Sequence, residues 1–258
     1  MSGSDEVQAH RPEEPLRLNL GAAKTYIPGF VNIDIDQKAE LTLDLGTDRL
    51  PFPDDSVDVV VSRHTLEHVP NYLFALSEIH RVMRHDGELL LSLPYVTRTE
   101  HHLVNPYHLH NFSERSFDFF DPSVMKGSAG EESETAFRKV FLRFNYNGYF
   151  GLAPRFYRVW ARKHLLNVVR QFDIGLVCIK DPTRPVDVGP ERARQLEQRM
   201  DELKRARTPY AVEGAQAAAT TAESPSSGRG SLLSPAGPRR ALGRARAAVK
   251  GRWEVRYD

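Results

Sequence analysis

The chain is poor in cysteine, since Cys178 is its single thiol among 258 residues. One cysteine excludes a disulfide within the chain. Because Cys178 falls in an apolar segment that is predicted to be a strand, we expect its side chain to lie in the core.

Long apolar runs are also missing, and no stretch approaches the roughly 20 apolar residues that a helix needs to cross a bilayer. The first fifteen residues have no apolar run and carry four acidic residues, Asp5, Glu6, Glu13 and Glu14. Both a signal peptide and a transit peptide require a different composition. We therefore expect a cytoplasmic protein with no transmembrane segment.

The composition fits one folded domain with extra tails. The chain has 40% apolar and 27% charged residues and a formal net charge of +1, enough apolar material for one sizeable core. We predict a disordered tail at 1–15, a domain at 16–181, a linker with a charged helix at 182–210, and a disordered basic tail at 211–258. The basic tail is more simply a solvated extension than a binding site for nucleic acid, lipid or an acidic protein.

The first half of the domain contains short apolar segments that are typical of a parallel sheet. They are residues 16–20, 30–35 and 57–61. Gly21 follows the first segment, Asp34 ends the second, and Asp44 ends a further short one. In a doubly wound sheet the ligand lies over the carboxyl ends of the strands, where glycine admits it and an acidic residue binds ribose hydroxyls. This order predicts a site for a nucleoside-bearing cofactor.

A second pattern, DLGTDRLPFPDDSVDVVVSRHTLEHV at 44–69, is more specific. Together with LNLG at 18–21 it resembles the type 11-like branch of the class I S-adenosylmethionine-dependent methyltransferases, whose members read L-x-x-G, then L-P-F-x-D and L-E-H-V. The resemblance covers roughly residues 16–180, the size of one domain. It implies an α/β fold with a doubly wound, seven-stranded, mostly parallel sheet and an antiparallel last strand, a Rossmann-like methyltransferase fold.

The resemblance also implies S-adenosylmethionine as the cofactor and assigns residues to it. Gly21, Ala22 and Ala23 would form the turn under the methionine part, and Asp34 would bind the ribose. Asp44 and Leu45 would frame the adenine. The expected cofactor-binding set is completed by Ile35 and Arg63.

Three positions depart from the family pattern. Asn19 stands where an acidic residue is usual, and Ala23 replaces the second glycine of G-x-G. Only twelve residues separate Gly21 from Asp34, near the minimum for a parallel crossover, so we expect a turn or a single helical turn there. A fold of this kind that has lost its cofactor is the alternative, but Asp34, Asp44 and the LPFPDD segment are retained together.

Periodicity predicts the remaining elements. We expect helices at 72–84, closed by Asp86 and Gly87, at 113–120, and at 156–172, and strands at 88–94, 136–146 and 174–180. The last two strands would pair as an antiparallel edge. The amphipathic 156–172 helix is expected to pack on the sheet, not to lie on a membrane surface. The charged helix at 191–207, with its stripe of Leu196, Met200 and Leu203, is expected to be exposed or to bind a partner.

Histidines supply candidate catalytic groups. Methyl transfer is an in-line displacement, so the acceptor must lie about 3 Å from the methyl group, and a hydroxyl acceptor must lose its proton. Histidine is the natural base near neutral pH. We predict that His108 or His64 is the base and that Glu67 assists it.

The run His64-x-x-Glu67-His68, followed by His108, also resembles a metal motif. Some O-methyltransferases, among them small-RNA terminal 2′-O-methyltransferases and ubiquinone-pathway enzymes, bind a divalent cation through Glu-x-x-Glu-His and a distal histidine. Three imidazoles would suit zinc or another transition metal better than magnesium. However, Leu-Glu-His-Val also occurs in members of the wider branch that bind no metal, where it caps and packs the next helix, and on that ground we expect no metal.

The acceptor is predicted by exclusion. Enzymes that methylate amines of adenine or glutamine carry an Asp/Asn-Pro-Pro-Tyr segment after the fourth strand, where this chain has Ser62-Arg63-His64-Thr65. A lone cysteine leaves no pair for cytosine-C5 methylation. Nucleic acid is thus not the expected partner, and we favour O-methylation of a small-molecule hydroxyl on a sugar or secondary metabolite. The alternatives are a catalytically lapsed cofactor-binding interaction protein and an RNA 2′-O-methyltransferase.

Overall fold

The computed structural model describes residues 14–124 and 134–210. Most of the expected N-terminal tail and all of the expected basic C-terminal tail lie outside the described residues. Nothing in the structure therefore tests those two predictions.

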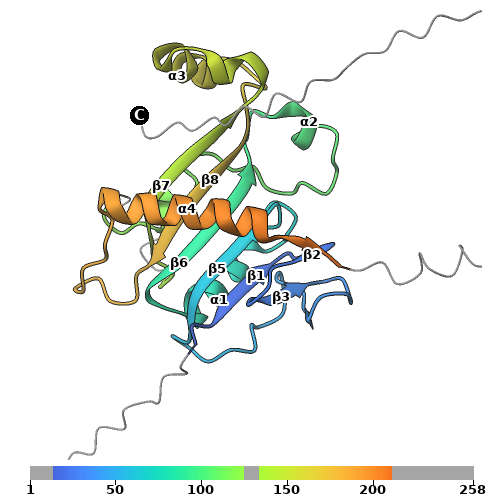
Figure 1. The fold of residues 1–258 in the computed structure, drawn as a ribbon, viewed down its shortest axis with the longest axis vertical. Helices are drawn as coiled ribbons and strands as arrows, with labels where there is room; N and C mark the ends of the chain where they lie inside the picture. The colour runs from blue at the N-terminus through green and yellow to red at the C-terminus, as the bar shows by residue number, and fades with distance from the viewer. Residues whose placement is uncertain (1–13, 125–133, 211–258) are drawn as a thin grey trace, which may run out of the picture. The chain divides into compact units, whose positions relative to one another are not determined.

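A seven-stranded sheet in the order β4-β3-β1-β5-β6-β8-β7 forms the centre of the fold (Figure 1). The strands are β1 (Arg17–Leu20), β3 (Val31–Asp34), β4 (Leu41–Thr42), β5 (Val57–Arg63), β6 (Met83–Pro94), β7 (Phe137–Tyr146) and β8 (Val169–Cys178). The first five strands of this order are parallel, and β8 is antiparallel to both of its neighbours. The predicted doubly wound fold with an antiparallel last strand is confirmed.

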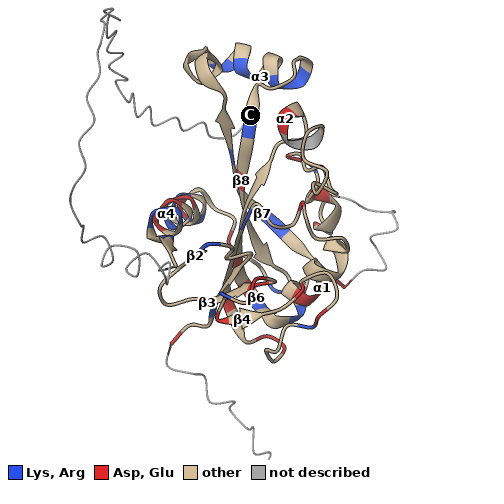
Figure 2. Cartoon of the chain, turned by 90° about the vertical axis from the view of Figure 1, so that its right-hand side faces the viewer, with Lys and Arg blue, Asp and Glu red and all other residues tan. Residues whose placement is uncertain are grey.

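Both faces of the sheet are covered by apolar packing, because successive side chains of the central strands point to opposite faces. Val60 of β5 packs in one apolar cluster, and Val59 and Val61 pack in the other. Helix α1 (Tyr72–Val82) covers the first face, and helix α4 (Pro190–Ala206) covers the second (Figure 2).

Helix α1 begins as predicted and ends earlier. The Asn71 side chain caps it by accepting a hydrogen bond from the Phe74 amide at 3.1 Å. The helix stops at Val82, because Met83 already pairs with Val57 of β5 as the first residue of β6. Asp86 and Gly87, which were expected to close the helix, lie instead within β6. They fall where the pairing of β6 with β5 shifts its register, between Met83 and Glu88.

Helix α4 corrects the prediction for residues 182–210. Its stripe of Leu196, Met200 and Leu203 is buried against the sheet, so the helix is neither exposed nor free for a partner. Its C-terminal half enters a charge cluster on the sheet, where Asp201 pairs with Arg143 and Lys204 pairs with the buried Asp173. The charge-rich sequence misled the prediction, because these charges are matched by residues of distant strands.

The short crossover between β1 and β3 explains why that face needs α4. Residues 21–30 contain no helix, and their single regular element is the two-residue strand β2 (Thr25–Tyr26). This strand pairs with β9 (Thr208–Pro209), which directly follows α4. Helix α4 thus takes the place that a crossover helix would fill. Of the two expected forms of the crossover, a turn or a single helical turn, the structure has turns.

Helix α3 (Arg155–His164) is shorter than the predicted 156–172 helix and contacts only the end of the sheet, where Ala161 is buried and Arg162 lies over the Phe144 ring. It lies beyond the ends of β7 and β8 (Figure 1), with Phe156 77% and Trp160 48% exposed. The buried Arg162 anchors it through an ion pair with Glu114. The chain leaves the helix early because β8 begins at Val169, opposite Tyr146.

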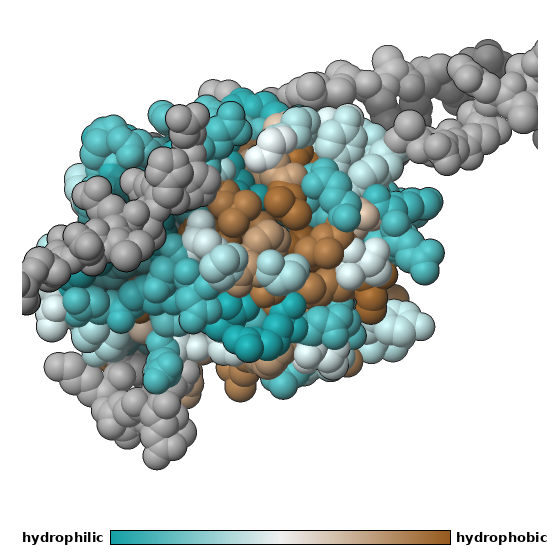
Figure 3. Space-filling model, turned by 90° about the horizontal axis from the view of Figure 1, so that it is seen from below, coloured by the Kyte–Doolittle hydropathy of each residue, from teal (hydrophilic) through white to brown (hydrophobic). Residues whose placement is uncertain are grey.

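The other short elements are α2 (Thr99–His102) and the 3-10 helices η1 (Asp118–Phe120) and η3 (Gly148–Leu152). The predicted helix at 113–120 is thus reduced to its last three residues. Among the described residues, no helix is long and apolar enough to span a membrane. Apolar residues do reach the surface, and Figure 3 shows a group of them in the middle of one face with hydrophilic residues around it.

Candidate functional site

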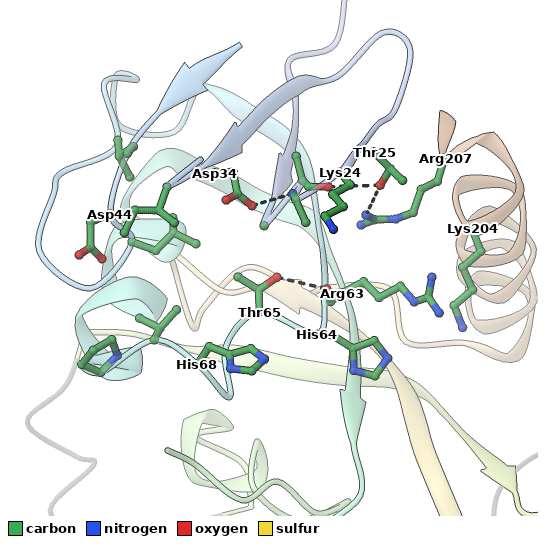
Figure 4. A pocket seen from close by; sticks show the side chains of 18 residues that line it. Lys24, Thr25, Asp34, Asp44, Arg63, His64, Thr65, His68, Lys204 and Arg207 are labelled. Carbon is green, nitrogen blue, oxygen red and sulfur yellow. Dashed lines mark hydrogen bonds between the residues drawn. The ribbon is translucent and has the colours of Figure 1, made fainter. Parts of the chain in front are cut away.

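A pocket of about 980 Å³ opens at the carboxyl ends of β1, β3 and β5 (Figure 4). Eighteen residues line it: Gly21, Ala22, Ala23, Lys24, Thr25, Asp34, Ile35, Leu43, Asp44, Leu45, Arg63, His64, Thr65, His68, Val69, Pro70, Lys204 and Arg207. All but the last two come from the first seventy residues. The position matches the expected ligand site of a doubly wound sheet.

The turn after β1 forms one wall of the pocket. Gly21 has a φ of +72°, and a Cβ atom there would lie 1.8 Å from Thr65 Oγ1, so glycine is required. The amides of Gly21 and Ala22 both donate to the Ile33 carbonyl. Ala23 also has a positive φ, 51°, although alanine occupies this conformation rarely.

Two carboxylates lie at one end of the pocket. Asp34 Oδ1 accepts a hydrogen bond from the Asp36 amide at 2.9 Å, and Asp44 Oδ1 accepts one from the Gly46 amide at 2.8 Å. Leu45 and Val69 provide buried apolar surface beside them. This end offers hydrogen-bond acceptors next to an apolar wall.

The opposite end is cationic (Figure 4). Arg207 donates to Asn19 Oδ1 at 2.9 Å and to Thr25 Oγ1 at 3.3 Å, and no carboxylate of the described residues forms an ion pair with it. Burial, and next the neighbouring Arg63, lower the pKa of Arg207 to about 10. Burial also lowers the pKa of Lys204, against the attraction of Asp173. Arg207 is therefore a buried guanidinium without a carboxylate partner among the described residues, and it is suited to bind an anionic group of a ligand.

Histidines form the third part of the site. His64 has a positive φ of 52°, and its Nε2 lies 3.1 Å from Gln171 Oε1. Its Nδ1 lies 3.3 Å from Glu67 Oε1, and Glu67 is fully buried. His68 follows, and its ring packs edge to face on the His108 ring with centroids 4.5 Å apart.

The structure brings most of the predicted site residues together. All eight residues expected to bind the cofactor line the one pocket, and so does His64. His108 does not line it but lies behind His68, and Glu67 is buried beside His64. Lys204 and Arg207 were missed, because residues 182–210 were interpreted as a linker. The apolar stripe Leu196, Met200 and Leu203 was the signal that this segment packs on the domain.

Comparison with known proteins agrees with this arrangement. Residues 31–91 match the model of a methyltransferase domain family. The uncharacterized methyltransferase YcgJ of Bacillus subtilis (strain 168) is 31% identical over 88 residues, which are 34% of this chain and 32% of that protein. The matched part thus spans about a third of the length of this curated relative.

Two solved structures are similar to this chain at low identity. The crystal structure of YcgJ from Bacillus subtilis has 16% identity and a TM-score of 0.43, covering 65% of this chain and 93% of that chain. A SAM-dependent methyltransferase from Archaeoglobus fulgidus has 15% identity and a TM-score of 0.47, covering 63% and 86%. In the matched segment and in the strand order of its sheet, the chain resembles the class I S-adenosylmethionine-dependent methyltransferases.

Proposed function

We propose that this chain transfers the methyl group of S-adenosylmethionine to a hydroxyl group of a small molecule, such as a sugar or a secondary metabolite. The observation that carries the proposal is the charge pattern of the pocket. Carboxylates stand at one end, cations stand at the other, and a histidine stands in the wall between them.

The charge pattern fits the two ends of the cofactor. The adenosine end carries hydroxyl and amino donors, which suit the acceptors Asp34 and Asp44. The methionine end carries a carboxylate, which suits the cations Arg63 and Arg207. Asn19, which stands where the family usually has an acidic residue, accepts a hydrogen bond from Arg207 and helps to position that guanidinium.

His64 is the favoured base for a hydroxyl acceptor, because it lines the pocket and His108 does not. Its Nε2 lies 3.1 Å from the Gln171 amide oxygen, and its Nδ1 lies 3.3 Å from the buried Glu67 carboxylate. These two contacts hold the imidazole in the wall of the pocket.

The open pocket also argues against a lapsed enzyme. A protein that had lost its catalytic function would have no reason to keep an acceptor space beside the methyl position. Here His64 and His68 face a cavity and are not covered by neighbouring side chains. Near them, the loop after β6 exposes Tyr107 and Leu109, which are suited to contact the face of a sugar ring.

The proposal is tested by calorimetry with two ligands that share an adenosine end. S-adenosylhomocysteine has the amino acid group, and 5′-methylthioadenosine lacks it. Arg207→Gln should weaken S-adenosylhomocysteine binding on the order of tenfold and leave 5′-methylthioadenosine binding unchanged. Arg205→Gln, an exposed cation two residues away, is the matched control.

Each result has a distinct meaning. No binding of either ligand by the unaltered chain would overturn the proposed function. Equal weakening of both ligands in Arg207→Gln would assign that residue a structural role only. Once binding is established, His64→Ala should retain S-adenosylhomocysteine binding and lose turnover in a screen of hydroxyl acceptors.

A further inference from the structure

Glu67 is a buried carboxylate without a hydrogen-bond donor. Its side chain is 0% exposed, and neither of its oxygens accepts a hydrogen bond from a described residue. Removing a carboxylate from water costs several kcal/mol unless it is paired and hydrogen-bonded. The contact with His64 Nδ1 at 3.3 Å is not aligned as a hydrogen bond, so it offsets only part of that cost. The position is explained if a cation binds there.

Two further ligand groups surround this carboxylate. A carboxylate oxygen of Glu67 and one ring nitrogen each of His68 and His108 all lie within 4.8 Å of one another. Three ligand atoms at these separations can reach one ion with small adjustments of their side chains, because the bonds to a transition metal are about 2.0–2.2 Å long.

The imidazole of His68 is oriented for coordination. Its Nδ1 lies 2.9 Å from the carbonyl oxygen of Tyr107. A carbonyl can only accept, so Nδ1 carries the proton and Nε2 keeps its lone pair in the neutral ring. Histidines that bind metals are usually fixed in this way, by donation from the other ring nitrogen to a carbonyl or carboxylate.

The backbone holds the distant part of the cluster in place. His108 is forty-one residues from Glu67 in the sequence, yet the amides of Leu109 and His110 both donate to the Glu67 carbonyl, at 2.8 and 3.2 Å. These bonds tie the loop after β6 to the turn after β5. The three side chains therefore meet because of the fold and not because of a flexible surface contact.

We propose that Glu67, His68 and His108 bind one divalent transition-metal cation. One carboxylate and two imidazoles form a donor set that suits zinc, cobalt or manganese and disfavours magnesium, which prefers oxygen ligands. Three protein ligands leave a coordination position open for a ligand oxygen. His68 lines the pocket, so the cation lies at its wall.

The proposed cation site does not depend on the proposed methyl transfer. Only a role of the cation in holding the acceptor oxygen rests on that function.

Cation binding is measured by itself, by titrating the chelator-treated full chain, without an affinity tag, with zinc chloride and with cobalt chloride. We expect one cation per chain, and visible absorption bands in the cobalt form that indicate nitrogen and oxygen ligands.

Three variants make the test specific. His108→Ala and Glu67→Gln should weaken cation binding at least tenfold, and His164→Ala, which removes an exposed histidine of α3, should not. Retained S-adenosylhomocysteine binding shows that each variant is folded. Because His108 is only half-buried, its variant remains informative even if the buried Glu67 does not tolerate substitution.

The proposal is overturned if the unaltered chain binds no cation at one equivalent, or if His108→Ala binds it as tightly as the unaltered chain. Equal weakening by His164→Ala would also overturn it, because the binding would then be non-specific. Cation binding without any binding of S-adenosylhomocysteine would uphold the metal site and reject the proposed methyltransferase activity.

Discussion

The carboxylate of Asp34 accepts a hydrogen bond from the backbone amide of Ala23 at 2.7 Å, across eleven residues of sequence. Ala23 has a positive φ of 51°, a conformation that costs an alanine roughly 1 kcal/mol. The bond thus fixes the turn where the family usually has a second glycine. Asp34 positions the turn as well as facing the pocket.

Substitution of Asp34 tests this double role. Asp34→Asn keeps a side-chain oxygen for the Ala23 amide but loses the charge, so S-adenosylhomocysteine binding should weaken by about 1–3 kcal/mol. Asp36→Asn, at an exposed neighbouring carboxylate, should change the affinity little. Calorimetric titration measures both, and an unchanged affinity in Asp34→Asn would mean that Asp34 does not contact the ribose.

A pair of glycines separates steric conflict from backbone strain. Gly21 and Gly29 both have positive φ, +72° and +76°, but a Cβ atom at Gly21 meets Thr65 and one at Gly29 meets nothing within 4 Å. Gly29→Ala should lower the free energy of unfolding by about 1 kcal/mol. Gly21→Ala should lower it by about 2–4 kcal/mol, because overpacking adds to the strain.

Urea unfolding followed by circular dichroism measures both glycine variants. Similar losses in the two would show that Thr65 moves away from an added methyl group at no cost. In that case the short distance between Gly21 and Thr65 would not be the reason that the turn needs a glycine.

The buried His80 predicts a pH dependence of stability. Burial is the main cause that lowers its pKa from 6.5, and the bond of its Nε2 to the Ile179 carbonyl at 3.0 Å opposes that shift in part. A histidine with a lower pKa in the folded state binds fewer protons there than in the unfolded state. The free energy of unfolding should therefore fall as the pH drops below about 6.5.

The His80→Gln variant isolates this contribution. It keeps a donor for the Ile179 carbonyl but cannot titrate, so the loss of stability between pH 7.5 and pH 5.5 should be smaller than in the unaltered chain. Urea unfolding at both pH values gives the difference. Equal losses in the two proteins would assign the pH dependence to other histidines.

Local patterns in the sequence were sufficient for the first half of the fold. Val57 and the run from Val59 to Val61 are buried on both faces of the sheet. The glycine and the aspartates at strand ends meet because parallel strands end at one edge. These patterns also located the pocket residues Gly21, Asp34 and Asp44.

The second half depended on contacts between distant residues. Val168, Val169 and Phe172 fit a helical stripe as well as a strand, and pairing of Val169 with Tyr146 decides for the strand. The charges of α4 gave no sign of their partners, since Asp173 and Arg143 lie on strands far away in sequence. Spacing alone does not encode such pairings.

The use of α4 and β9 to complete the pocket has a consequence for synthesis of the protein. A chain emerges from the ribosome from its N-terminus, and domains tend to fold as they emerge. All seven strands of the sheet are made before Arg207, which forms the cationic end of the pocket. The nascent chain can therefore assemble its sheet first and gain a complete cofactor site only after α4 and Arg207 have emerged.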